Sequence, residues 1–325
     1  MADTDKGGES TLTVLVALGI NLAIAAMKAF AGVITGSAAM LSEAAHSVAD
    51  TCTEVFLLTA LRRSGKPADA RHPFGYGKER YFWSLIAAMS IFVSGAVFAF
   101  IEGFRTLLGP PEEQTQPLVG YVVLAIAFVL EGVSWLRAMR QVRAEAAESG
   151  DKILHHLRIS DDPTVKTVLL EDSAALAGLL LAFAGLGLHQ LTGSSAWDGL
   201  ASLAIGALLA AVAYTMARTN LGLLIGQQAD RRLLAAVRNR LAEQPEVDFV
   251  VDVLSMNTGT DRVLFCARLD FAAALDSTEL ERVVVRIDSM LRAEFAELDE
   301  VFLEPVPRND PELRARVLAR YGHPL

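Results

Sequence analysis

Six long apolar stretches restrict this chain more than any other feature of its sequence. They lie at residues 11–36, 38–62, 81–108, 117–139, 165–191 and 197–225. A helix crosses the core of a bilayer, about 30 Å thick, with roughly 20 apolar residues. Because each stretch is long enough, the sequence predicts an all-α domain of six transmembrane helices at 11–227, preceded by a short N-terminal tail at 1–10.

After residue 227 the pattern changes to short mixed segments, which are typical of a soluble domain. The predicted elements are a helix at 230–243, strands at 248–255 and 262–271, a helix at 277–294 capped by Ser277, and a strand at 300–304. This α-β-β-α-β order predicts a small α+β domain of the ferredoxin or metallochaperone-like kind at 228–308, with a C-terminal tail at 309–325. From residue 228 on, 18 Asp and Glu face 13 Arg and no Lys, and this acidic balance argues against a nucleic-acid partner.

The charge of the connecting segments predicts the orientation in the bilayer. Residues 62–80 and 137–166 carry six Lys or Arg each, whereas 36–38, 109–116 and 191–196 carry none. Cytoplasmic loops are the ones enriched in Lys and Arg. Both termini are therefore expected in the cytoplasm. The Ala-, Leu- and Arg-rich composition favours a bacterial plasma membrane.

Ionisable residues inside the second and fifth apolar stretches mark a candidate site. Charged groups at membrane depth are costly, so they usually line an ion pathway. Glu43, His46 and Asp50 are spaced i, i+3 and i+7, which puts them on one helical face. Glu171 and Asp172 lie in the fifth stretch. Imidazole nitrogen with carboxylate oxygens is a donor set suited to Zn²⁺, and also to Mn²⁺, Fe²⁺, Co²⁺ or Cd²⁺.

The depths of these groups in the bilayer also agree. At about 1.5 Å per residue, Asp50 lies about 18 Å inward from the outer end of its stretch, and Asp172 about 12 Å outward from the inner end of its own. In a core of about 30 Å the two depths coincide. The alternative is a structural His46–Asp50 pair with Asp172 hydrogen-bonded to a neighbouring helix. Three ionisable groups at one depth favour the metal site.

The other polar residues within the apolar stretches are interpreted as packing or interfacial groups. These residues are Asn21, Lys28, Glu102, Glu131 and Asp198.

Two motifs carry a resemblance to a known family. They are TGSAAMLSEAAHSVAD at 35–50 and HPFGYGKER at 72–80, and with them nearly the whole chain resembles the cation diffusion facilitator family. The Leu-Leu-Glu-Asp sequence of the fifth stretch resembles the branch that includes the mitochondrial zinc transporter of animals and its bacterial relatives. The resemblance implies a homodimer without a prosthetic group that exports Zn²⁺ or a similar ion from the cytoplasm in exchange for H⁺, by alternating access.

The resemblance also implies roles for single residues. His46 and Asp50 would supply half of the transport site, and Asp172 part of the other half. Val168 stands where typical members have a His, and a Val side chain cannot bind a metal. Either Glu171, a water or a backbone oxygen completes the shell, or the selectivity and mechanism differ from those of ordinary zinc exporters.

A second family site is incomplete in this sequence. Asp69 and His72 match two of its ligands, while Tyr76 stands where many members have His; a role of His72 in ordering the loop is the alternative. The family's metal sites in the C-terminal domain rely on several His residues, and here the tail has only His323.

Two rival functions stay open at this point. One is a metal channel or facilitator without proton coupling, and the other is a non-transporting membrane metal sensor or scaffold. An enzyme is not expected, because the sequence has no nucleophile–base constellation, phosphate loop or redox motif.

Overall fold

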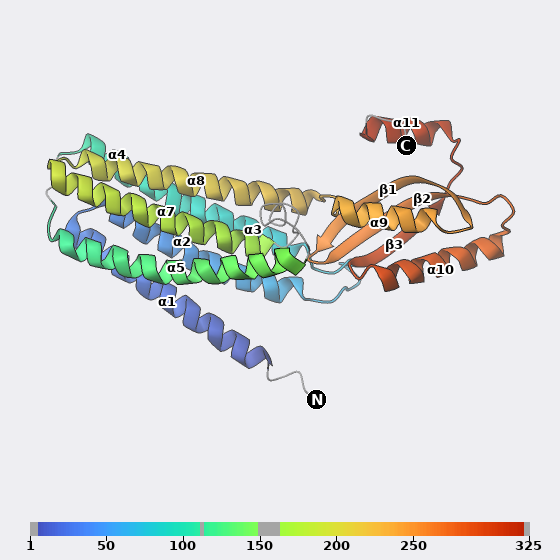
Figure 1. The fold of residues 1–325 in the computed structure, drawn as a ribbon, viewed down its shortest axis with the longest axis horizontal. Helices are drawn as coiled ribbons and strands as arrows, with labels where there is room; N and C mark the ends of the chain where they lie inside the picture. The colour runs from blue at the N-terminus through green and yellow to red at the C-terminus, as the bar shows by residue number, and fades with distance from the viewer. Residues whose placement is uncertain (1–5, 111–113, 149–162, 322–325) are drawn as a thin grey trace. The chain divides into compact units, whose positions relative to one another are not determined.

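The computed structural model describes residues 6–110, 114–148 and 163–321. It divides into two compact units, which are Met1–Arg63 with Glu79–Leu221, and Ser64–Lys78 with Gly222–Leu325. The first unit is helical and the second contains a small sheet (Figure 1).

The helices of the first unit fall on the six predicted apolar stretches. They are α1 (Lys6–Thr35), α2 (Ala38–Ser64), α3 (Glu79–Ser90), the π-helix η1 (Ile91–Val97), α4 (Phe98–Leu108), α5 (Pro117–Glu148), α7 (Pro163–Thr192) and α8 (Ala196–Ile225). The segments α3, η1 and α4 follow one another without a break over Glu79–Leu108.

Four of the helical segments within the described residues are long and apolar enough to cross a membrane. They are Glu79–Leu108, Pro117–Ala144, Leu169–Thr192 and Ala196–Ile225. Helix α1 contributes a shorter apolar stretch, Asn21–Thr35. Helix α2 falls outside this group because its ionisable and hydroxyl side chains lower its hydropathy. The expectation of spanning helices is therefore confirmed for four of the six predicted segments.

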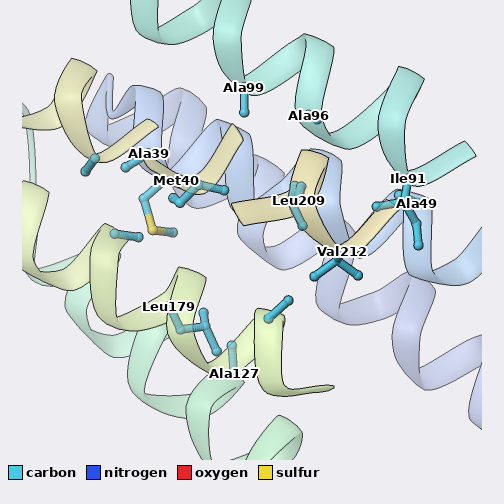
Figure 2. Close-up of a cluster of buried hydrophobic side chains, with 14 of the residues drawn as sticks. Ala39, Met40, Ala49, Ile91, Ala96, Ala99, Ala127, Leu179, Leu209 and Val212 are labelled. Carbon is cyan, nitrogen blue, oxygen red and sulfur yellow. The ribbon is translucent and has the colours of Figure 1, made fainter. Parts of the chain in front are cut away.

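Small side chains hold these helices together. Figure 2 shows residues of α2, η1, α4, α5, α7 and α8 that meet in one buried cluster, labelled Ala39, Met40, Ala49, Ile91, Ala96, Ala99, Ala127, Leu179, Leu209 and Val212. Between helices in lipid, close packing of small residues replaces the hydrophobic effect as the source of association. Large apolar side chains such as Val93, Leu108 and Leu118 point outward and are exposed, as expected where the solvent is a bilayer.

The N-terminus of α2 is fixed by a residue of α8. Asp198 accepts hydrogen bonds from Ser37 Oγ at 2.6 Å and from the backbone N–H of Ala38 at 2.5 Å. Further along the two helices, Ser42 Oγ and Ser202 Oγ lie 2.6 Å apart. A carboxylate at a helix N-terminus satisfies backbone donors that have no partner within the helix. These bonds hold α2, which carries most of the candidate site, against α8.

The second unit contains a three-stranded sheet with helices packed on it. Its elements are α9 (Arg231–Ala242), β1 (Val247–Gly259), β2 (Arg262–Phe271), α10 (Ser277–Glu294), β3 (Leu298–Pro305) and α11 (Pro311–Tyr321). The strand order is β1-β2-β3, with β1 and β2 antiparallel and β2 and β3 parallel. Leu241 of α9 and Ile287 of α10 pack with Phe265 and Leu269 of β2 in one buried core.

Two features differ from the sequence-based expectations. The cap of α10 is Asp276 rather than Ser277: its side chain accepts from the N–H of Glu279 at 2.7 Å, and Glu279 Oε2 accepts from the N–H of Asp276 at 3.3 Å. This reciprocal capping box satisfies two backbone donors at once, which a Ser one position later would not. Most of the expected tail at 309–325 is the helix α11, which packs through Leu313 and Val317 on the sheet domain.

The segment Ser64–Lys78 belongs to the same unit as the sheet. A Cβ on Gly77 would overlap the carbonyl oxygen of Thr258 and Cα of Gly259, so only a glycine permits this close approach to the β1–β2 hairpin. Lys78 Nζ donates a hydrogen bond to the carbonyl of Leu224 at 3.4 Å. The sequence gives no sign of this docking, because it depends on contacts about 180 residues apart.

Candidate metal site

The centre of the candidate site is one face of α2. His46 Nδ1 lies 3.3 Å from Asp50 Oδ1, one helical turn further along, and the His46 side chain is 1% exposed. Glu43 is fully buried on the same face. The predicted i, i+3, i+7 face is therefore present, and it points into the helical unit rather than outward.

Several polar atoms around this face are buried and have no hydrogen-bond partner among the described residues. They are Glu43 Oε1, His46 Nδ1 and Nε2, Asp50 Oδ1, Glu54 Oε2 and, on α7, Glu171 Oε1. His46 Nδ1 and Asp50 Oδ1 contact each other at 3.3 Å, but their orientation is not that of a hydrogen bond. An unsatisfied buried donor or acceptor costs about 1–3 kcal/mol, and more when it is charged. Six such atoms in one region suit a site that is completed by a cation or by protons.

The register between α2 and α7 brings their carboxylates to the same level. A Cβ on Gly178 of α7 would overlap Glu43 Oε1, so these two residues face each other. The two helices run in opposite directions along the unit. Seven residues from this contact, Asp50 on α2 and Glu171 on α7 are therefore level with each other, and their carboxylates interact electrostatically.

Asp172 has a different neighbour from Glu171. Its Oδ2 accepts a hydrogen bond from Ser134 Oγ of α5 at 2.9 Å, so it faces α5 while Glu171 faces α2. Within the described residues, no group of three or more His, Cys, Asp or Glu side chains is gathered closely enough to hold a metal ion. The donors thus stand on two facing helices without forming a closed shell in this conformation. The side chain of Val168 and the residue His323 lie outside the part of the chain that the structure describes.

A buried ion-pair cluster lies beside the α2 face, and sequence reasoning missed it. Lys28 Nζ of α1 lies 3.2 Å from Glu43 Oε2 and 3.6 Å from Glu131 Oε1 of α5, and it donates a hydrogen bond to Ser47 Oγ at 2.8 Å. The Lys28 side chain is 0% exposed. Its position inside an apolar stretch, 17 residues after the first residue and eight before the last, was the available signal, because a Lys so far from either end cannot reach water by extending its side chain.

A second polar contact joins α1 to α2. The side-chain amide of Asn21 donates to Glu54 Oε1 at 2.5 Å. Asn21, like Lys28 and Glu131, therefore contacts ionisable residues of neighbouring helices instead of merely filling space. By contrast, Glu102 pairs with Arg105 of its own helix α4, at 3.8 Å, away from this region.

The loop residues Asp69 and His72 lie in the second unit and form a tight turn. Asp69 Oδ1 accepts from the backbone N–H of His72 at 2.8 Å, and Oδ2 accepts from the hydroxyl of Tyr76 at 2.7 Å. His72 Nδ1 is 3.4 Å from Asp69 Oδ1, and its ring packs 4.2 Å from that of Tyr76, centroid to centroid. The Tyr76 hydroxyl, helped by the His72 backbone, lowers the pKa of Asp69 to about 2. These contacts are those of an ordered turn.

Apolar spanning helices around a buried cluster of imidazole and carboxylate groups define a class of protein, the membrane transporters of cations. The sequence profile of the cation efflux transmembrane domain matches residues 14–225, and the chain belongs to this family, the cation diffusion facilitators. The resemblance seen in the two motifs is thereby confirmed.

The relatives place the chain more narrowly. It is 34% identical to the mitochondrial proton-coupled zinc antiporter SLC30A9 of Mus musculus over 258 residues. This matched region is 79% of this chain and 45% of the relative. It is 31% identical to metal tolerance protein C4 of Arabidopsis thaliana, over 96% of this chain and 66% of the relative. It is 24% identical to the manganese efflux system protein MneP of Bacillus subtilis, over 90% of this chain and 94% of the relative. The chain spans less than half the length of the mouse antiporter.

Proposed function

We propose that this protein binds one divalent metal ion between α2 and α7 and exports it from the cytoplasm in exchange for protons. His46 and Asp50 are the ligands from α2, and Glu171 and Asp172 those from α7. The observation that carries the proposal is the group of buried polar atoms without hydrogen-bond partners on the facing sides of these helices, within the described residues. Membership of the cation efflux family supports it.

Proton exchange follows from the chemistry of the ligands. A ligating imidazole must be neutral and a ligating carboxylate ionised, so protons and metal compete for the same atoms. In a region shielded from water, the site is stabilised when it holds either a metal ion or protons, and an empty, fully charged site is costly. A carrier that changes access only in these two loaded states exchanges one for the other.

Completion of the shell requires a movement. Glu171 already interacts electrostatically with Asp50, whereas Asp172 is held by Ser134. In the proposed cycle, metal binding draws Asp172 from Ser134 toward His46 and Asp50. Glu171 takes the place that Val168 cannot fill.

The transported ion in this proposal is Zn²⁺ or a similar first-row ion. One imidazole with carboxylate oxygens suits zinc and leaves manganese as the main competitor. The printed names of the relatives include a zinc antiporter and a manganese efflux protein.

The proposed topology has six spans, with α1 and α2 completing the four apolar ones. The polar residues of these two helices face the interior, as Lys28, Glu43 and His46 show by their burial, which leaves their apolar sides for lipid. The Lys- and Arg-rich loops support cytoplasmic termini. The membrane is proposed to be a bacterial plasma membrane, and the assembly a homodimer, as the family resemblance implies.

Transport by inside-out membrane vesicles tests the proposal. The cytoplasmic side then faces the medium, so Zn²⁺ added outside should enter vesicles with an acidic lumen while the luminal pH rises in step. Collapsing the pH gradient with an ionophore should slow zinc entry. Zinc entry that ignores the pH gradient would instead support an uncoupled channel, and absence of saturable uptake would support a sensor or scaffold.

A further inference from the structure

Lys28 is the one described cation whose side chain is fully buried in the helical unit. Its ammonium is held from two other helices, by Glu43 and Ser47 of α2 and by Glu131 of α5, at 2.8–3.6 Å. A buried ammonium is retained only where carboxylates and hydrogen bonds replace its water shell. These contacts fix the positive charge in place, so it cannot withdraw when another cation approaches.

This fixed charge lies next to the proposed metal ligands. Ser47, which binds Lys28, follows His46 directly, and Glu43 precedes it by less than one turn. The Lys28 ammonium interacts electrostatically with both Asp50 and His46. In a region of low dielectric such interactions are far stronger than in water. A metal ion bound by His46 and Asp50 is therefore repelled by Lys28 and attracted by Glu43 and Glu131.

We propose that Lys28 tunes the transport site: its tethered ammonium repels the bound divalent ion and keeps the site weak enough to unload. The inference rests on the proposed function. It assigns to Lys28 a charge role that does not require contact with the metal. The net charge of the cluster formed by Lys28, Glu43 and Glu131 sets the affinity, while the ligands of α2 and α7 set the coordination.

A series of variants that change the net charge of the cluster by one unit at a time tests this role of Lys28. Lys28→Met makes the cluster more negative by one unit, Glu43→Gln makes it more positive by one, and the double variant restores the wild-type net charge. Zinc binding to purified protein in detergent is followed by calorimetry, counting only the binding that Asp50→Asn abolishes. We expect about tenfold tighter binding for Lys28→Met, about tenfold weaker for Glu43→Gln, and the double variant within about threefold of wild type.

The kinetic constants of zinc transport separate this charge role from a merely structural role of Lys28. In vesicles, Lys28→Met should lower KM and kcat together, because a tighter site loads at lower zinc and releases it slowly. Lys28→Arg, which keeps the charge, should restore both. Arg105→Met is the matched control, because it removes a cation paired with Glu102 on α4, and it should change neither constant.

Equal affinity of Lys28→Met and wild type, or weaker binding in all three variants, would overturn the inference. If Lys28→Met does not fold, the comparison of the double variant with Glu43→Gln tests the inference. The double variant must then bind zinc about tenfold more tightly than Glu43→Gln. Wild-type protein without any Asp50-dependent zinc binding would show that the proposed function itself has failed. Failure of the proposed function is therefore distinguishable from failure of the Lys28 inference, because it is seen in the wild-type protein alone.

Discussion

Glu43 of α2 occupies the space that a Cβ on Gly178 of α7 would fill. This contact sets the register of two helices that run in opposite directions. Asp50 and Glu171 each lie seven residues from it, toward the same end of the unit, so at about 1.5 Å per residue both are displaced by about 10 Å. The absence of a side chain at Gly178 thus aligns Asp50 and Glu171, two of the proposed metal ligands.

Substitution of Gly178 tests this register. Gly178→Ala places a methyl group against Glu43 and should destabilise the helical unit by about 1–3 kcal/mol through overpacking. The measurement is the midpoint of thermal unfolding in detergent, which should be lower for Gly178→Ala than for the wild-type protein. Gly132→Ala is the matched control, because the nearest side-chain atom to its added Cβ is 4.0 Å away, on Leu176. The control should be neutral or stabilising by up to about 1 kcal/mol. Equal midpoints for the two variants would contradict the register.

Removal of the Asp50 charge should abolish metal transport. Asp50→Asn keeps the size of the side chain but loses an anionic ligand, so zinc uptake at limiting zinc should fall at least about 100-fold. Glu102→Gln is the control, since Glu102 pairs with Arg105 on α4, and its uptake should match wild type. Normal uptake by Asp50→Asn would show that Asp50 is not a ligand.

The hydrogen bond between Ser134 and Asp172 should oppose metal binding. If Asp172 must leave Ser134 to join the shell, Ser134→Ala removes a bond worth about 1 kcal/mol from the metal-free state, and zinc should bind about fivefold more tightly. Calorimetry measures the change. Ser94→Ala serves as control, because its hydroxyl donates only to the backbone of its own helical segment. An unchanged affinity in Ser134→Ala would place Asp172 outside the shell.

The turn at Asp69 should depend on pH. The pKa of Asp69 is lowered to about 2 from an ordinary value of 3.8, chiefly by the Tyr76 hydroxyl. Ionised Asp69 therefore stabilises the turn at pH values above its ordinary pKa, and this contribution is lost as the pH falls through about 2. Tyr76→Phe should raise the pKa of Asp69 toward 3.8, as measured by NMR titration of its carboxyl carbon. A titration unchanged by Tyr76→Phe would contradict the contact.

The sequence predicts this architecture where the pattern is local. Long apolar runs mark the helices of the first unit, and the spacing of Glu43, His46 and Asp50 predicts one face of α2, on which Glu43 and His46 are buried. Simple counting of helix rise also predicts matching depths in the bilayer for Asp50 and Asp172. These features depend only on periodicity and length.

Contacts between distant segments could not be derived in the same way. The sequence places Lys28 within an apolar stretch, but only the packing of α1 against α2 and α5 reveals its carboxylate partners. Glu171 and Asp172 are adjacent, and the choice of which faces α2 depends on the rotation of α7 about its axis. Helix rotation is set by side-chain packing that periodicity in a uniformly apolar helix does not encode.

X-ray absorption at the zinc edge tests the central claim most directly, by comparing the full chain at one equivalent of zinc with the His46→Ala variant. We predict a first shell of about four light donors near 2.0–2.2 Å, with outer-shell imidazole scattering that disappears in His46→Ala. Imidazole scattering that persists unchanged in the variant would place the ion elsewhere and contradict the account.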